Sequence, residues 1–213
     1  METVKSIKDL RILREKLASE VLLPGRERAR VCCGTACTAS GSSKVISSLE
    51  AEAERKGLDI EIVRTGCQGM CQKGPIMKME PREGKDVFYQ RVRPEQAPSL
   101  IQYTFVSGTP YRQALYREDF MSDPTTEMLN LPFYKKQVRI ALRNNDKIDP
   151  TNIHHYIAVG GYAALEKALA SMTPDDVLHE IDRALLRGRG GAGFPAGQKW
   201  HHTKSAPGAR KLS

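Results

Sequence analysis

Four cysteines in two closely spaced pairs are the residues of this 213-residue chain best suited to chemistry. Cys32 and Cys37 lie in VCCGTAC, and Cys67 and Cys71 lie in GCQGMC. The N-terminal stretch METVKSIKDLRILREKLASE has the pattern of a charged amphipathic helix and not of a secretion signal. Thiols gathered in such a chain indicate a metal or cluster site in a reducing cytoplasm rather than disulfides.

The spacing of the two pairs favours a [2Fe–2S] cluster, which takes four thiolates, two at each iron. Structural zinc is the main alternative, although its cysteine pairs are usually closer together. Four buried cysteines without a ligand are a third reading. Gly34, Gly66 and Gly69 argue against that reading, because glycines let backbone N–H groups approach sulfur closely. Only Cys32 gives the four-residue gap, so we expect Cys33 to be a spectator or at most a substitute ligand.

A glycine-rich run, RGRGGAGFPAGQKW at residues 187–200, is the second candidate site. Its backbone can lie against a bulky anion, with exposed N–H groups forming a nest and a following helix start adding positive potential. Lys199 would supply a charge to a phosphate. The run is neither a Walker motif nor a dinucleotide G-x-G-x-x-G motif. A flexible linker is the alternative.

The hydrophobic pattern around the cysteines predicts an α/β arrangement. After an extra first helix, the order of elements is that of a thioredoxin-like fold. The cysteine loops follow the first two strands, so both should emerge at the same end of the sheet. The predicted elements are a helix at 5–22, a strand at 29–33, a loop with Cys37, a helix at 43–56 ending at Gly57, a strand at 58–63, a hairpin of 76–79 with 87–92, and a helix at 94–106.

Glycine and proline breakers divide the chain into a domain at 1–107, a linker at 108–147 and a third segment at 148–213. We expect the linker, which contains a strand-like stretch at 138–142, to wrap onto a neighbour. In the third segment, one predicted helix begins at Asp149–Pro150, is interrupted at Gly160–Gly161 and continues over 162–170. A second predicted helix begins at the capping box of Thr173 and runs to about Leu186.

The charge balance does not indicate a nucleic-acid protein. Thirty-three Lys and Arg against 25 Asp and Glu give a formal net charge of +8, but the basic residues are spread along the chain and aromatic content is only 6%. No nucleic-acid-binding motif is present. No apolar run has the length needed to span a bilayer, so we expect no membrane insertion.

The phrase GRGGAGFPAGQKW closely resembles the flavin-binding signature of the NADH-binding flavoprotein subunit of respiratory complex I. The same subunit type occurs in NAD-dependent formate dehydrogenases and in multimeric iron hydrogenases. Many bacterial relatives carry a fused N-terminal thioredoxin-like [2Fe–2S] domain with VC-x4-C and GC-x-G-x-C-x-x-GP motifs, which VCCGTAC and GCQGMCQKGP resemble. PFYKKQVRIALRN, IDPTNIHHYIAVGGYAALEKAL and MTPDDVL are also similar to this family.

The resemblance implies that residues 148–213 begin an FMN- and NADH-binding α/β domain. It places Arg189 and the glycines against the FMN phosphate and ribityl chain, Lys199 at the phosphate, and Phe194 near the nicotinamide ring. It assigns no catalytic side chain. The implied cofactor-binding residues are Gly188, Arg189, Gly190, Gly191, Ala192, Gly193, Phe194 and Lys199.

The resemblance further implies hydride transfer from NADH to FMN, then single electrons through iron–sulfur centres to other redox subunits, such as ferredoxin-like, hydrogenase or formate dehydrogenase subunits. The family continues for several hundred residues, so we expect this chain to be a C-terminally truncated fragment that is inactive with NADH and holds little FMN. A stand-alone [2Fe–2S] electron carrier that docks on a larger complex is the alternative, followed by a zinc-stabilised interaction domain.

Overall fold

A computed structural model of the chain describes residues 4–21, 25–117 and 131–208. The chain divides into two compact units, Ile12–Val159 and Met1–Arg11 with Gly160–Ser213. The helices of the described residues are α1 (Ile7–Val21), α2 (Thr35–Ala39), α3 (Ser42–Lys56), α4 (Ala97–Ile101), α5 (Pro132–Lys135), α6 (Ile153–Ala158), α7 (Ala163–Ser171), α8 (Pro174–Arg183) and α9 (Ala196–Ser205), with 3₁₀ turns η1 (Cys71–Lys73) and η2 (Pro94–Gln96) and a π-helical turn η3 (Gln102–Val106).

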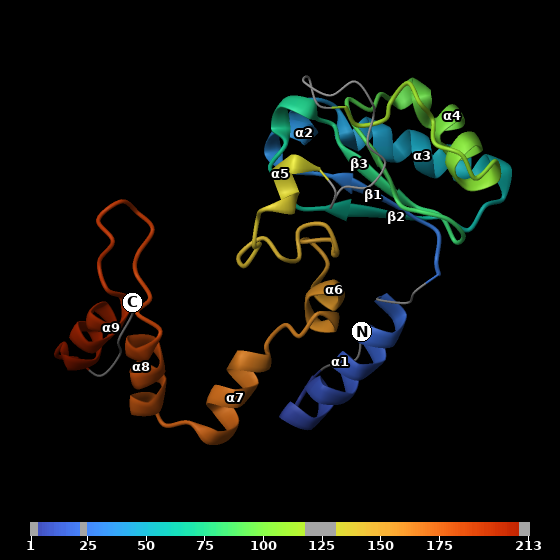
Figure 1. Ribbon diagram of the computed structural model, residues 1–213. Coiled ribbons are helices and arrows are strands. Elements are labelled where there is room, and N and C mark those ends of the chain that lie inside the picture. The colour runs from blue at the N-terminus through green and yellow to red at the C-terminus, as the bar shows by residue number, and fades with distance from the viewer. Residues whose placement is uncertain (1–3, 22–24, 118–130, 209–213) are drawn as a thin grey trace. The chain divides into compact units, whose positions relative to one another are not determined.

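A four-stranded mixed sheet organises the larger unit, with the order β2 (Glu61–Thr65), β1 (Arg28–Cys32), β3 (Met77–Glu80), β4 (Val87–Tyr89). β1 is parallel to β2 and antiparallel to β3, and β3 is antiparallel to β4. Because β1 and β2 run in the same direction, the loops that follow them leave the same end of the sheet (Figure 1). This arrangement confirms the predicted thioredoxin-like α/β fold.

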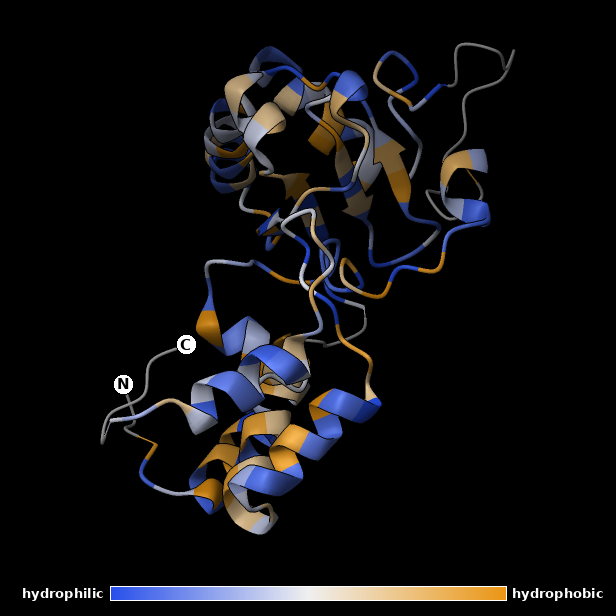
Figure 2. Cartoon of the chain, turned by 90° about the vertical axis from the view of Figure 1, so that its left-hand side faces the viewer, coloured by the Kyte–Doolittle hydropathy of each residue, from blue (hydrophilic) through white to orange (hydrophobic). Residues whose placement is uncertain are grey.

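The main core lies between the sheet and the helices α3 and α4. Alternate residues of β1, Ala29 and Val31, are fully buried against the apolar face of α3, which includes Ile46 and Leu49. In Figure 2 the strands are mostly hydrophobic, whereas the neighbouring helices also carry hydrophilic residues. Gly57 ends α3 in the left-handed conformation, as expected of a C-terminal glycine.

A second apolar cluster lies at the cysteine-bearing end of the unit. It joins residues of the strands and cysteine loops to residues far downstream in the chain. Its members are Cys32, Cys37, Met70, Ile76, Phe88, Tyr116, Leu131 and Tyr134.

Several predicted elements are wrong in detail. The second strand occupies 61–65 rather than 58–63, because its ladder with β1 begins where Glu61 pairs with Arg28. Cys37 lies on the short helix α2 instead of in a loop. Residues 138–142 form no strand within the described chain, since their exposed backbone follows α5 into a series of turns.

The segment expected as a linker packs within the larger unit. Gln90 donates its backbone N–H to Ala114, and Tyr116 donates to Phe88, so residues 114–116 extend the edge of the sheet at β4. Residues 131–149, called the strap below, place Leu131, Tyr134 and Ile148 in the interior of the same unit. The larger unit therefore runs well past residue 107, because these side chains complete its apolar interior.

The smaller unit is helical. Thr173 caps α8 with the predicted capping box, closed by Asp176, and Pro174 occupies the first turn. In the larger unit, the helix expected at Asp149–Pro150 begins instead at Ile153, because Asp149 accepts a hydrogen bond from the backbone of Thr151 and Asn152 provides the cap. In the described parts of the chain, no helix combines the length and apolar character needed to cross a bilayer.

Candidate metal centre

The two cysteine pairs start from adjacent parallel strands. Cys32 is the last residue of β1 and pairs in register with Thr65, the last residue of β2. Cys67 follows two residues later, and α2 carries Cys37 back along the same end of the sheet. The end of the sheet that holds the candidate ligands also carries α2 and α5 in Figure 1. The fold thus brings together the four cysteines singled out in the sequence.

Within each pair the thiols interact directly. The sulfurs of Cys67 and Cys71 are 4.0 Å apart. A hydrogen bond between Cys32 and Cys37 lowers the pKa of Cys32 and raises that of Cys37. Hydrogen bonding to Cys67 similarly raises the pKa of Cys71. In the described residues, no group of three or more Cys, His, Asp or Glu side chains is placed to hold one metal ion, and the thiols stand as two pairs.

Two glycines permit the close approach of the cysteine loops. A Cβ on Gly34 would lie 2.9 Å from the Cβ of Cys67, and one on Gly74 would lie 2.8 Å from the sulfur of Cys37. Both distances are too short for a side chain without movement of the loops. At Gly66 the neighbouring atoms belong to Asn145 rather than to a cysteine.

Backbone N–H groups point at the sulfurs. Cys32 accepts hydrogen bonds from the backbones of Gly34 and Gln68. Gly69, held at a φ of +87° that favours glycine, donates to the sulfur of Cys67 at 3.3 Å. Such N–H donors stabilise thiolates and surround the sulfurs in iron–sulfur sites. The donor set and its backbone environment therefore fit a [2Fe–2S] cluster.

Cys33 directly follows β1 and lies apart from the second apolar cluster, which contains Cys32 and Cys37. It packs against the main core, and Ser42 lies 4.0 Å from its sulfur. Burial raises the pKa of the Cys33 thiol. These contacts favour the expected spectator role.

The strap supplies neighbours that the sequence did not reveal. Tyr134 donates its hydroxyl to the carbonyl of Gln68 at 2.6 Å, and Asn145 donates to the carbonyl of Cys67 at 2.9 Å. Burial raises the pKa of Tyr134, so its hydroxyl remains a donor near neutral pH.

Lys73, which is 3% exposed, donates to the carbonyl of Arg117 and is a buried cation close in sequence to Cys71.

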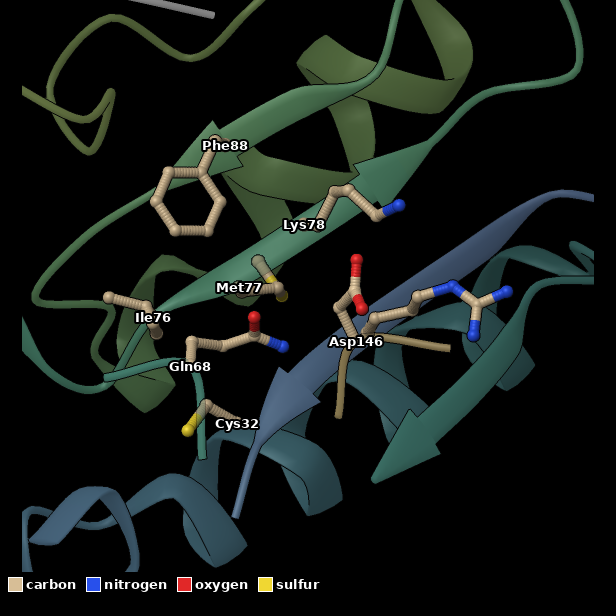
Figure 3. Close-up of a pocket in the computed structure, with 8 residues that line it drawn as sticks. Cys32, Gln68, Ile76, Met77, Lys78, Phe88 and Asp146 are labelled. Carbon is tan, nitrogen blue, oxygen red and sulfur yellow. The ribbon is translucent and has the colours of Figure 1, made fainter. Parts of the chain in front are cut away.

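A small pocket lies beside Cys32. Figure 3 shows three of its lining residues: Cys32 of β1, Gln68 of the second cysteine loop and Asp146 of the strap. The side-chain oxygen of Gln68 is buried there without a hydrogen-bond partner. The pocket marks where the strap meets the candidate ligands.

The glycine-rich run forms a loop between α8 and α9 in the smaller unit. Gly188 donates its N–H to Phe194, and Ala196 donates to Leu186, so both ends of the run are tied together. The loop also contains the other residues that the resemblance implies as ligands: Arg189, Gly190, Gly191, Ala192 and Gly193. Lys199 is exposed in the first turn of α9. Phe194 is 49% exposed.

Glycine at two of these positions is not demanded by the protein itself. A Cβ on Gly190 would meet nothing within 4 Å, and one on Gly188 would make only ordinary contacts with Phe194. Neither residue has a positive φ, whereas Gly191 and Gly193 do. Space left open at Gly190 is compatible with a ligand that approaches the backbone.

Comparison with known proteins finds a family match for the first part of the chain. Residues 23–104 match the family of thioredoxin-like [2Fe–2S] ferredoxins. A solved thioredoxin-like [2Fe–2S] ferredoxin from Aquifex aeolicus is 22% identical and covers 42% of this chain and 88% of its own, with a TM-score of 0.37.

Three curated relatives share stretches of higher identity. The NADP-reducing hydrogenase subunit HndC of Solidesulfovibrio fructosivorans is 58% identical over 66 residues, 31% of this chain and 13% of the relative. An NADH-quinone oxidoreductase subunit of Rhizobium meliloti is 47% identical over 72 residues, 34% of this chain and 17% of the relative. The corresponding NADH-quinone oxidoreductase subunit of Aquifex aeolicus is 51% identical over 59 residues, 28% and 14% respectively. The match therefore spans less than a fifth of each relative.

Proposed function

We propose that this chain, whose residues 23–104 are a thioredoxin-like [2Fe–2S] ferredoxin domain, carries single electrons on a cluster bound by Cys32, Cys37, Cys67 and Cys71. The supporting observation is the pairing of these thiols at the carboxyl ends of two adjacent parallel strands. Two cysteines on each side suit two irons, whereas a single zinc ion needs its ligands to converge on one point.

The protein's own part in this chemistry is to hold and tune the sulfurs. When bound, the cluster accepts and releases one electron. The backbone of Gly34 and Gln68 stabilises negative charge at Cys32, and Gly69 does so at Cys67. Cys32 and Cys37 are each 2% exposed, so water is largely excluded at one pair, while Cys71 is exposed and offers a short path to an electron partner.

The wider proposal is that the chain belongs to the electron path of a nicotinamide-nucleotide oxidoreductase, in which NADH reduces FMN and the cluster carries electrons onward to other redox subunits. Two observations support it. The three relatives are a hydrogenase subunit and two NADH-quinone oxidoreductase subunits. The glycine-rich run leaves open space at Gly190 with Lys199 in the following helix turn, as a phosphate site requires.

Iron analysis and spectroscopy test the cluster. The chain purified without oxygen should be brown-red, should contain iron and acid-labile sulfide in equal amounts, and should give an electron paramagnetic resonance signal after reduction by dithionite. Colourless protein that contains zinc would support the structural-domain alternative and overturn this proposal.

Flavin titration tests the second site. FMN added to the chain should bind weakly, because the run by itself offers few contacts, and the Lys199→Ala variant should lose about 1.5–3 kcal/mol of that binding. The exposed Lys167→Ala variant of α7 is the matched control. Equal FMN binding by the Lys199→Ala variant, the control and the unaltered chain would remove Lys199 from the proposed site.

A further inference from the structure

The strap, residues 131–149, contacts the second cysteine loop at two consecutive peptide groups. Tyr134 is 5% exposed and donates to the carbonyl oxygen of Gln68 at 2.6 Å. That carbonyl belongs to the peptide group whose N–H, on Gly69, donates to the sulfur of Cys67 at 3.3 Å. The peptide group is thus held at both ends, by the strap on its oxygen and by a candidate ligand on its hydrogen.

The preceding peptide group is held in the same way. Asn145 donates its side-chain amide to the carbonyl oxygen of Cys67 at 2.9 Å. The N–H of this peptide group belongs to Gln68, whose backbone acts to lower the pKa of the Cys32 thiol. Two strap side chains therefore hold two consecutive peptide groups of the second cysteine loop, one of which donates its N–H to the sulfur of Cys67.

Further contacts fix the strap over the loop. Gln68 returns a hydrogen bond from its side-chain amide to the backbone carbonyl of Asn145 at 3.1 Å. Gly66 has no side chain where Asn145 packs, and an added Cβ would lie 2.9 Å from the Asn145 amide carbon. The guanidinium of Arg139 stacks 5.6 Å from the centre of the Tyr134 ring. Arg30 of β1 donates to the carbonyl of Lys147.

We infer that Tyr134 and Asn145 are positioning residues of the [2Fe–2S] site, which hold the two peptide groups between Cys67 and Gly69, including the N–H donor to Cys67, and thereby set the reduction potential of the cluster. This inference rests on the proposed function. A hydrogen bond accepted at the carbonyl polarises the same peptide group and strengthens its N–H as a donor. An N–H donor directed at a ligand sulfur stabilises the added electron, so its loss lowers the potential.

The test uses the full chain with its cluster reconstituted. Tyr134→Phe removes one hydroxyl and keeps the buried ring, and Asn145→Ala removes the second donor. Tyr89→Phe is the matched control for the first, because the Tyr89 hydroxyl is buried and bonded to Thr104 and the backbone of Tyr111, away from the cysteine loops. Asn144→Ala, at the neighbouring strap residue, is the control for the second.

Both strap variants should lower the midpoint potential, shift the g-values of the reduced cluster and release iron to a chelator about tenfold faster, whereas the controls keep the wild-type potential and spectrum. Wild-type values in both strap variants, or equal shifts in the controls, overturn the positioning role. If Asn145→Ala fails to fold, Tyr134→Phe decides the question. Absence of a cluster from the wild-type chain itself would instead defeat the proposed function.

Discussion

The Nε of Arg30 lies 2.8 Å from a carboxylate oxygen of Glu80, across the ladder between β1 and β3. Both side chains are mostly buried, and Lys78 also pairs with Glu80. Burial acts to raise the pKa of Glu80, but the charges of Lys78 and Arg30 outweigh it and hold the pKa below its ordinary value of 4.5. Arg30 also reaches the strap through the carbonyl of Lys147, so this ion pair supports the region next to the candidate cluster.

Glu80→Gln should lower the free energy of unfolding at pH 7 by about 2 kcal/mol, because it removes charge-assisted hydrogen bonds. A carboxylate whose folded-state pKa is lowered contributes stability above its unfolded pKa and loses that contribution as the pH falls through its folded pKa. The difference between wild type and variant should therefore narrow as the pH falls below 4.5. Urea unfolding over a pH series measures it. The exposed Glu83→Gln is the control, and a difference independent of pH would contradict the assignment.

Cys33→Ser should retain wild-type iron content and the same reduced-state spectrum, because its sulfur faces Ser42 and the main core. Cys32→Ser should lower the iron content or shift the spectrum, because it removes a thiol hydrogen-bonded to Cys37 and to two backbone N–H groups. Iron analysis and electron paramagnetic resonance provide the measurements. If the Cys33→Ser variant lost the cluster colour while the Cys32→Ser variant kept it, Cys33 rather than Cys32 would be the cluster ligand.

Gly34→Ala should strongly reduce the iron bound after reconstitution. The new methyl group would push away Cys67, which belongs to the other cysteine loop. Gly190→Ala is the matched control, since its methyl group meets open space and its φ is not positive. The readout is iron per chain, with circular dichroism to confirm that the apo fold survives. Normal iron content in Gly34→Ala would show that the loops can separate without loss of the site.

A fragment that ends at residue 159 should unfold in one transition, whereas one that ends at residue 107 should be less stable by roughly 3 kcal/mol or more, because it exposes apolar surface normally covered by Leu115, Tyr116, Leu131 and Tyr134. Urea unfolding of the two apo fragments compares them. Equal stability of the two fragments would support the domain boundary that the sequence predicts at residue 107.

The strands, the helix at 42–56 and the clustering of the cysteines at one end of the sheet could be predicted, because alternation and helical periodicity are local signals. The strap could not. Val138, Ile140 and Leu142 alternate like a strand, yet they are exposed, and the buried members Leu131 and Tyr134 show no periodic pattern. The strap acts through hydrogen bonds to backbone carbonyls that lie 66 and 78 residues earlier in the chain, and no local sequence pattern encodes such contacts.

The distance along the chain between the cysteines and the strap orders their appearance during synthesis. Asn145 follows Cys67 by 78 residues, and at about 5–20 residues per second this separation corresponds to roughly 4–16 seconds of translation. All four candidate ligands are synthesised before Tyr134. The nascent chain therefore presents its second cysteine loop uncovered for several seconds, and that interval admits a cluster donor before the strap closes over the loop.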